Sequence, residues 1–219
     1  MSKIIPSKPF LMIFYGFPGS GKTYFARQFC ENVQAAHLES DRIRMELFEK
    51  PRYDQQENMI TSQIMTYMTE EFLSAGLSVI FDVNALRAGQ RKMLHALANK
   101  YKVPVITVWL QLDPESSYDR SIRRDRRKAD DKYVAVWDRK SFDQIVASMQ
   151  KPDAKENPVV ISGKHLYTTQ RNAVFKTLRD NGIIIEQDAN RNIAKPGMVN
   201  LVSSSFNRVD YTKRNISIN

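Results

Sequence analysis

Cysteine is nearly absent from this chain, because Cys30 is the only one among 219 residues. A single cysteine excludes a disulfide within the chain and a metal site built from several cysteines. The sequence also lacks any apolar run approaching the ~20 residues that span a membrane. The N-terminal stretch, MSKIIPSKPF, has no long hydrophobic segment and no small-residue cleavage site, unlike a secretory signal. We therefore expect a cytoplasmic protein without a membrane partner.

Repeats and low-complexity tracts are missing as well, and the composition is that of a globular protein. Hydrophobic residues make up 42% of the chain and charged residues 26%, which are ordinary values. The length suffices for one α/β domain with a small addition. The formal net charge of +9 favours a polyanionic partner, although a nucleotide site alone also requires basic residues.

The clearest motif lies near the N-terminus. Residues 11–15 form an apolar run typical of a buried strand, and residues 16–23, GFPGSGKT, fit the P-loop pattern G-x-x-x-x-G-K-[ST] at every specified position. Glycines are needed there because backbone N–H groups must approach phosphate oxygens closely. We expect Lys22 to contact the β- and γ-phosphates of ATP and the Thr23 hydroxyl to bind Mg²⁺. The predicted ATP-binding residues of the loop are Gly16, Gly19, Ser20, Gly21, Lys22 and Thr23.

Strands alternate with helices along the rest of the chain. Apolar runs predict further strands at residues 35–38, 77–83, 103–112 and 159–162. Helical spacing predicts helices at residues 22–33, 53–75, 90–101 and 168–180, one from Asp113 through the arginines that follow it, and another within 132–149. The alternation predicts a three-layer α/β fold of the P-loop NTPase type with a parallel central sheet. We place its domain at residues 9–182 and treat residues 183–219 as a small C-terminal extension.

Polar residues follow two of the predicted strands. The segment ESDRIR, residues 39–44, begins a helix with Ser40 or Asp41 as its cap, and Asp82 ends a strand that is apolar on both faces. Ligands of open α/β sheets bind at such strand ends. A carboxylate there can act as general base toward a hydroxyl, and an arginine one turn away can hold the substrate. We therefore expect Asp41 to be catalytic, with capping as the alternative, and Arg44 to contact the acceptor. Asp82 is expected to orient Mg²⁺ or touch the acceptor, with a buried structural acid as the alternative.

Arginine is concentrated in the helix predicted after LDPESS. Six cations fall within nine residues, and Arg120, Arg124 and Arg127 share one face at i, i+4 and i+7. Such a cluster repels itself unless anions are near. This favours a mobile lid that faces the ATP phosphates over an exposed charged surface. We expect Arg124 to help neutralise the γ-phosphoryl group.

The guanine-reading tetrapeptide NKxD is absent, and no run of acids ends a strand in the manner of an oligomeric ATPase. The segments GFPGSGKT, SDRIR and FDVNALRAGQR, together with the arginine helix, resemble the kinase domain of phage-type polynucleotide 5′-kinases. They also resemble the wider group of P-loop kinases that includes zeta-type toxins and small-molecule phosphotransferases. The similarity covers about residues 9–130 by motif and extends to 182 by element order.

This resemblance implies a kinase-type fold and a role for each matched residue. Lys22 and Thr23 would bind ATP and Mg²⁺, Asp41 would be the general base, and Arg44 would lie on the acceptor side. Asp82 and Asn84 match the D-x-N that follows a strand, on the substrate side. Arg120 and Arg124 would be the lid arginines, with Arg127 as a partner.

Three functions are compatible with the sequence. The first is ATP-dependent transfer of the γ-phosphate to the 5′-hydroxyl of a nucleic acid. The second keeps this chemistry and changes the acceptor to a small-molecule alcohol, such as a nucleotide-sugar, an antibiotic or a sugar. The third is a nucleotide-regulated protein that binds nucleic acid without transferring phosphate, against which Asp41 argues.

Overall fold

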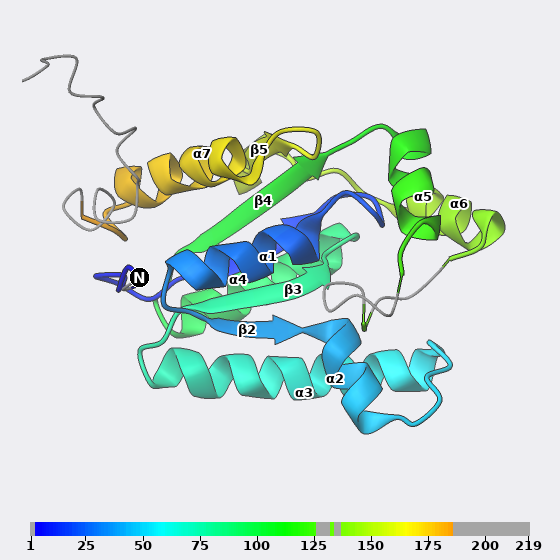
Figure 1. The fold of residues 1–219 in the computed structure, drawn as a ribbon. Helices are drawn as coiled ribbons and strands as arrows, with labels where there is room; N and C mark the ends of the chain where they lie inside the picture. The colour runs from blue at the N-terminus through cyan, green and yellow to red at the C-terminus, as the bar shows by residue number, and fades with distance from the viewer. Residues whose placement is uncertain (1–2, 126–131, 134–136, 186–219) are drawn as a thin grey trace, which may run out of the picture.

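The centre of the molecule is a parallel sheet of five strands in the order β2-β3-β1-β4-β5. This computed structural model describes residues 3–125, 132–133 and 137–185. The strands run side by side with their carboxyl ends at one edge (Figure 1). Their bounds are close to the predicted ones: β1 (Leu11–Tyr15), β2 (Ala36–Glu39), β3 (Val79–Asn84), β4 (Val105–Gln111) and β5 (Val159–Ser162).

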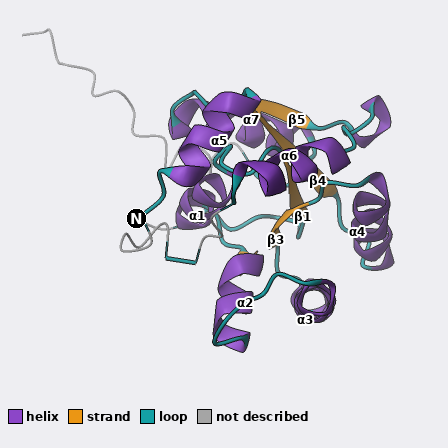
Figure 2. Cartoon of the chain, turned by 90° about the vertical axis from the view of Figure 1, so that its right-hand side faces the viewer, coloured by secondary structure: helices purple, strands orange, loops and turns teal. Residues whose placement is uncertain are grey.

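Helices cover both faces of this sheet and complete the three predicted layers (Figure 2). Side chains alternate between the faces of a strand, so neighbouring residues of β1 enter different cores. Met12 and Phe14 pack against α1 (Lys22–Asn32) and α7 (Tyr167–Asp180). Leu11 and Ile13 pack against α3 (Gln55–Ser74) and α4 (Ala88–Lys100). Because both faces of β1 are buried in these cores, polar functional groups can lie only at the ends of this strand.

Three shorter helices lie at the carboxyl edge of the sheet: α2 (Ser40–Leu47), α5 (Pro114–Ile122) and α6 (Arg139–Ser148). Asp113 caps α5 through the backbone N–H of Ser116, as predicted, and Asp138 caps α6 in the same way. The prediction for α2 was wrong, because its N-cap is Glu39 and no side chain caps it. Strand β2 runs into α2 without a loop, so Asp41 lies inside the first turn and is not used as a cap.

The predicted arginine helix is shorter than expected. Helix α5 ends at Ile122, Arg123 is its C-cap, and Arg124 lies beyond the helix. A single helical face shared by Arg120 and Arg124 is therefore wrong, while Arg127 lies outside the described residues. Like charges four residues apart weaken a helix, which explains why the helix stops where the arginines become dense.

Both ends of the described chain belong to the packed unit. Ile4 pairs with Val33 in an isolated bridge, and the backbone N–H of Ser7 donates to the carbonyl of Ile183 at 2.8 Å. Ile183 and Ile184 are buried in the core of α1 and α7. The packed unit thus exceeds the proposed limits of 9–182 at both ends, and the extension beyond Ile185 lies outside the described residues. Within the described part, no helix has the length and apolar character that crossing a membrane requires.

Candidate active site

The P-loop, residues 16–23, joins β1 to α1 and depends on its glycines for two reasons. Gly19 has a φ of 86°, which L side chains rarely adopt. A β-carbon at Gly19 would also lie 2.1 Å from the carbonyl oxygen of Ser117 in α5. Gly21 is the N-cap of α1, and no side chain caps this helix. The N–H groups of the first turn of α1 thus lack a side-chain acceptor, which suits an anion such as phosphate.

Lys22 folds back onto the loop. Its ammonium donates to the carbonyl oxygens of Gly16 at 2.9 Å and Phe17 at 2.8 Å, and the Asn84 amide donates to the same Gly16 oxygen at 2.6 Å. Burial lowers the pKa of Lys22 to about 7, an effect that Asp82 opposes and Arg124 reinforces. A phosphate beside this ammonium would favour its charged form.

Asp82 lies at the end of β3, beside Thr23. The Thr23 hydroxyl donates to Asp82 Oδ1 at 3.3 Å, and His37 Nε2 lies 3.1 Å from Asp82 Oδ2. Hydroxyl and carboxylate oxygens are the ligands that Mg²⁺ prefers, so these two side chains fit the metal predicted for them. Ligand atoms of His37, Glu39 and Asp82 also lie within 4.8 Å of one another, but Glu39 already accepts two bonds from Arg27. The motifs gave no signal for His37, whose contact depends on the pairing of β2 with β3.

Asp41 differs from the other acids near the loop. Among the described residues, no hydrogen bond or ion pair is found for its carboxylate. Burial raises its pKa to about 6, and the charges of Asp82 and Glu39 add to this effect, while Arg44 and Arg124 oppose it. Asp41 therefore carries a carboxyl group that can exchange a proton near neutral pH.

Arg44 is buried and engaged by neighbouring side chains. Its guanidinium lies 3.2 Å from Glu57 Oε2 and donates to Asn58 Oδ1 at 2.6 Å, with its plane over the ring of Tyr53. Glu57 also accepts bonds from the backbone N–H groups of Arg52 and Tyr53. The Arg44–Glu57 pair thus fixes the turn before α3 as a wall of the site. The motifs gave no signal for Glu57, which falls within the helix predicted over residues 53–75.

One cavity of about 530 Å³ is lined by most of the predicted site residues. Arg120 is not on its wall, because its guanidinium donates to the carbonyl of Gly163 at 2.8 Å. Two loop residues, Gly16 and Ser20, do not line this cavity, and Ser20 is buried. Of the predicted residues, the cavity is lined by Gly19, Gly21, Lys22, Thr23, Asp41, Arg44, Asp82, Asn84 and Arg124. It is also lined by residues given no role from sequence, including Tyr53, Asn58, Arg87, Gln90 and Trp137.

Comparison with known proteins identifies the class. Residues 11–152 match the AAA domain family AAA_33, and the chain belongs to this family. No curated protein sequence matches the chain. The fold is also that of solved kinases at low sequence identity, which confirms the predicted α/β fold with its parallel sheet.

Three solved structures illustrate the range of these neighbours. A sugar kinase from Janibacter sp. HTCC2649 is 15% identical, with a TM-score of 0.56 over 80% of this chain and 95% of that one. The Mycobacterium tuberculosis APS kinase CysC, solved with AMPPNP and APS, is 17% identical, with a TM-score of 0.58 over 80% and 99%. The Pnkp1/Rnl/Hen1 RNA repair complex is 20% identical, with a TM-score of 0.53 over 68% and 45%. The fold is thus kinase-like and is compatible with several acceptors.

Proposed function

We propose that this protein is an ATP-dependent phosphotransferase that moves the γ-phosphate to an alcohol. The observation that carries the proposal is Asp41: its carboxylate has no hydrogen bond or ion pair among the described residues, lies in the same cavity as the P-loop, and has a pKa raised to about 6. A general base works best when its pKa is near the working pH. A protein that only bound nucleotide would not need a partly buried acid whose pKa is raised toward neutrality.

The remaining residues of the cavity fit the other roles of phosphoryl transfer. The uncapped first turn of α1 and Lys22 would bind the phosphates of ATP. Thr23 and Asp82 would hold Mg²⁺, which supplies positive charge to the phosphate oxygens when bound. Arg124 lines the same cavity and would neutralise charge on the transferred group. Arg120 and Arg127 are proposed as lid residues on sequence alone.

For the acceptor, we propose first the 5′-hydroxyl of a nucleic acid. Tyr53 and Trp137, whose ring centroids are 5.6 Å apart, line the cavity that contains Asp41. Aromatic side chains stack on bases of any sequence. Arg87 is exposed at the same cavity, and no ion pair of its side chain is found in the described part of the chain. It would be available for a backbone phosphate.

A small-molecule alcohol is the second candidate, and one observation favours it. Arg44, the arginine expected to hold the acceptor, already has its charge matched by Glu57. A phosphate would have to compete with this buried carboxylate. A neutral sugar needs only hydrogen bonds, which Asn58 and Gln90 can supply from the cavity wall.

The test is an incubation with γ-labelled ATP, Mg²⁺ and one acceptor at a time. A 5′-hydroxyl DNA or RNA oligonucleotide that becomes labelled at low salt supports the first candidate. Label on a sugar or nucleotide-sugar, with none on oligonucleotides, supports the second. Binding of ATP and nucleic acid without transfer to any acceptor would overturn the proposal in favour of a binding protein.

Salt dependence separates the two acceptors further. If the acceptor is a polynucleotide, its affinity should fall with salt, with a log–log slope of about −0.7 per phosphate contacted on a single strand. A neutral small molecule should bind with a shallow slope. In these acceptor assays, Asp41→Asn is the test variant and Asp119→Asn is its matched control. Asp119 is suitable because it is exposed on α5 and lies outside the cavity.

A further inference from the structure

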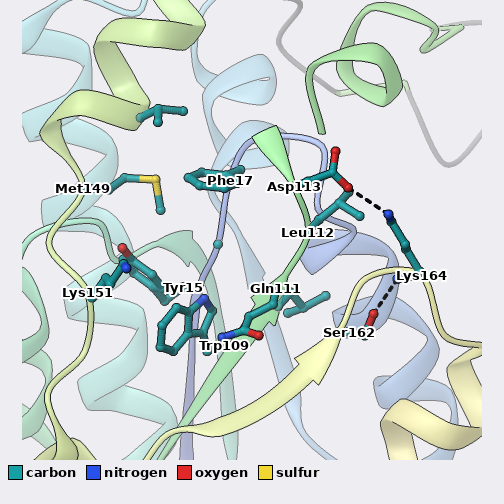
Figure 3. A pocket seen from close by; sticks show the side chains of 13 residues that line it. Tyr15, Phe17, Trp109, Gln111, Leu112, Asp113, Met149, Lys151, Ser162 and Lys164 are labelled. Carbon is teal, nitrogen blue, oxygen red and sulfur yellow. Dashed lines mark hydrogen bonds and ion pairs between the residues drawn. The ribbon is translucent and has the colours of Figure 1, made fainter. Parts of the chain in front are cut away.

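A second cavity, of about 660 Å³, lies behind the P-loop. Gly16 and Phe17 border it from the loop, and β1, β4, the end of β5 and the end of α6 supply most of its other walls (Figure 3). Neither Lys22 nor Thr23 lines it, and it shares no lining residue with the cavity that contains Asp41. Its volume is within the range of about 300–1,000 Å³ in which proteins bind small molecules.

Aromatic rings and a thioether form opposite walls of this cavity. Tyr15 and Trp109 lie on one side with ring centroids 5.5 Å apart, and Phe17 and Met149 lie across from them (Figure 3). Tyr15 is held in place, because it is buried and the guanidinium of Arg91 lies over its ring. Aromatic faces and methionine sulfur both favour contact with a planar ring.

The charges at the mouth of the cavity leave a positive excess. Asp113 and Lys164 form an ion pair at 2.9 Å, so their charges match (Figure 3). Lys151 also lines the cavity, and no hydrogen bond or ion pair of its ammonium is found among the described residues. Its position is fixed through the backbone, because the carbonyl of Lys151 accepts a bond from Arg91 at 3.3 Å. The exposed side chain of Lys151 thus extends from a fixed point of the backbone beside the cavity.

We propose that this cavity is a second ligand site, separate from the nucleotide site, that binds a compact aromatic anion. The ring would lie between the Tyr15–Trp109 wall and the Phe17–Met149 wall, and the acidic group would meet Lys151. The site requires both features, because burying an aromatic ring supplies the affinity and the unmatched ammonium of Lys151 selects an anion over a neutral ring.

The first experiment uses 8-anilinonaphthalene-1-sulfonate, an aromatic anion that becomes fluorescent in apolar sites. We expect it to bind the full-length protein in a 1:1 ratio, with unchanged affinity when AMPPNP saturates the P-loop. Displacement by AMPPNP would overturn the proposal, because the probe would then occupy the nucleotide site. Absence of saturable binding would overturn it as well.

Two pairs of variants locate the probe. Val146→Trp fills the cavity from α6, whereas Ala147→Trp changes an exposed neighbour that does not line it. We expect the first to weaken binding by about tenfold or more, a difference of about 1.4 kcal/mol, and the second to leave it unchanged. Equal affinities for these two proteins would contradict the proposed position.

The second pair tests the charge. Lys151→Met should weaken binding of the sulfonate probe by about three- to fivefold, the range of an exposed ion pair. It should leave the uncharged analogue N-phenyl-1-naphthylamine unaffected. The matched control is Lys155→Met, which removes an exposed lysine outside the cavity. If both substitutions have the same effect, or if Lys151→Met weakens both probes equally, the anion site is wrong.

Discussion

The charged forms of side chains are disfavoured in one of the two cavities beside the P-loop and favoured in the other. Around the loop, burial lowers the pKa of Lys22 to about 7 and raises that of Asp41 to about 6, so both charges are disfavoured. In the second cavity, the bond from Lys164 holds the pKa of Asp113 well below its usual range. Groups with disfavoured charges gain most from a ligand that restores a partner. The comparison therefore supports the two proposals, in which the first cavity carries out chemistry and the second only binds a ligand.

Replacing Lys22 is expected to have the largest effect. Lys22→Ala should abolish transfer of labelled phosphate, because it removes the cation beside the β- and γ-phosphates. The melting temperature should change little, since the hydrogen bonds of this ammonium among the described residues go to loop carbonyls and not to the core. Lys92→Ala, an exposed substitution on α4, is the control. Normal transfer by folded Lys22→Ala would remove the P-loop from the mechanism.

Asp41→Asn should lower turnover by about 10²–10⁴, the usual contribution of a positioned general base. Affinity for AMPPNP, measured by calorimetry, should stay within a few-fold, because the role proposed for Asp41 is toward the acceptor and not toward the nucleotide. A decrease in turnover of less than a few-fold would make Asp41 a structural residue. The proposed contrast, in which only the first cavity contains a catalytic group, would then be wrong.

The pH dependence follows from the same carboxyl group. A base must be deprotonated, so kcat/KM should rise with pH and level off above about 6. The stability of the folded protein, in contrast, should decrease as pH rises. The folded protein holds this proton more tightly than the unfolded chain, so the stabilisation present below about pH 4 is lost as pH rises through 6. Asp41→Asn should therefore raise the melting temperature by a few degrees at pH 8 but not at pH 4.

The smallest expected effect is proton uptake on nucleotide binding. With a pKa of about 7, Lys22 is mostly uncharged at pH 8 in the free protein. Bound phosphates should raise this pKa, so that less than one proton is taken up per nucleotide. Calorimetry of AMPPNP binding in two buffers of different ionisation enthalpy measures the uptake, and Lys22→Met should eliminate it. Equal heats in both buffers would show that Lys22 is charged before binding.

Local signals predicted the parts of the molecule that depend on local sequence. The P-loop, the five strands and the Asp113 cap all follow from patterns within a few residues. The end of α5 did not, because arginine is a good helix former and a repulsive cluster still reads as helix. Asp41 was placed in the site for its position after β2, and the structure adds that capping does not use its carboxylate.

Sequence motifs could not predict contacts between residues that are distant in the sequence. Glu57 lies 13 residues from Arg44, and its pairing depends on how α2 packs on α3. Tyr15 and Trp109 belong to apolar runs that predict buried strands equally well whether or not a cavity lies beside them. Lys151 gains significance only because Arg91 ties its backbone to the start of α4. Such features require the spatial arrangement of elements that sequence periodicity does not encode.

The bonds that join Ser7 to Gly182 and Ile183 bring the two ends of the described chain together at the amino edge of the sheet (Figure 1). Both cavities open at the opposite, carboxyl edge. A surface attachment at the exposed Lys8, next to Ser7, would therefore hold the molecule with its ligand sites facing outward. Single-molecule fluorescence and immobilised binding assays can use this geometry without a substitution near either cavity.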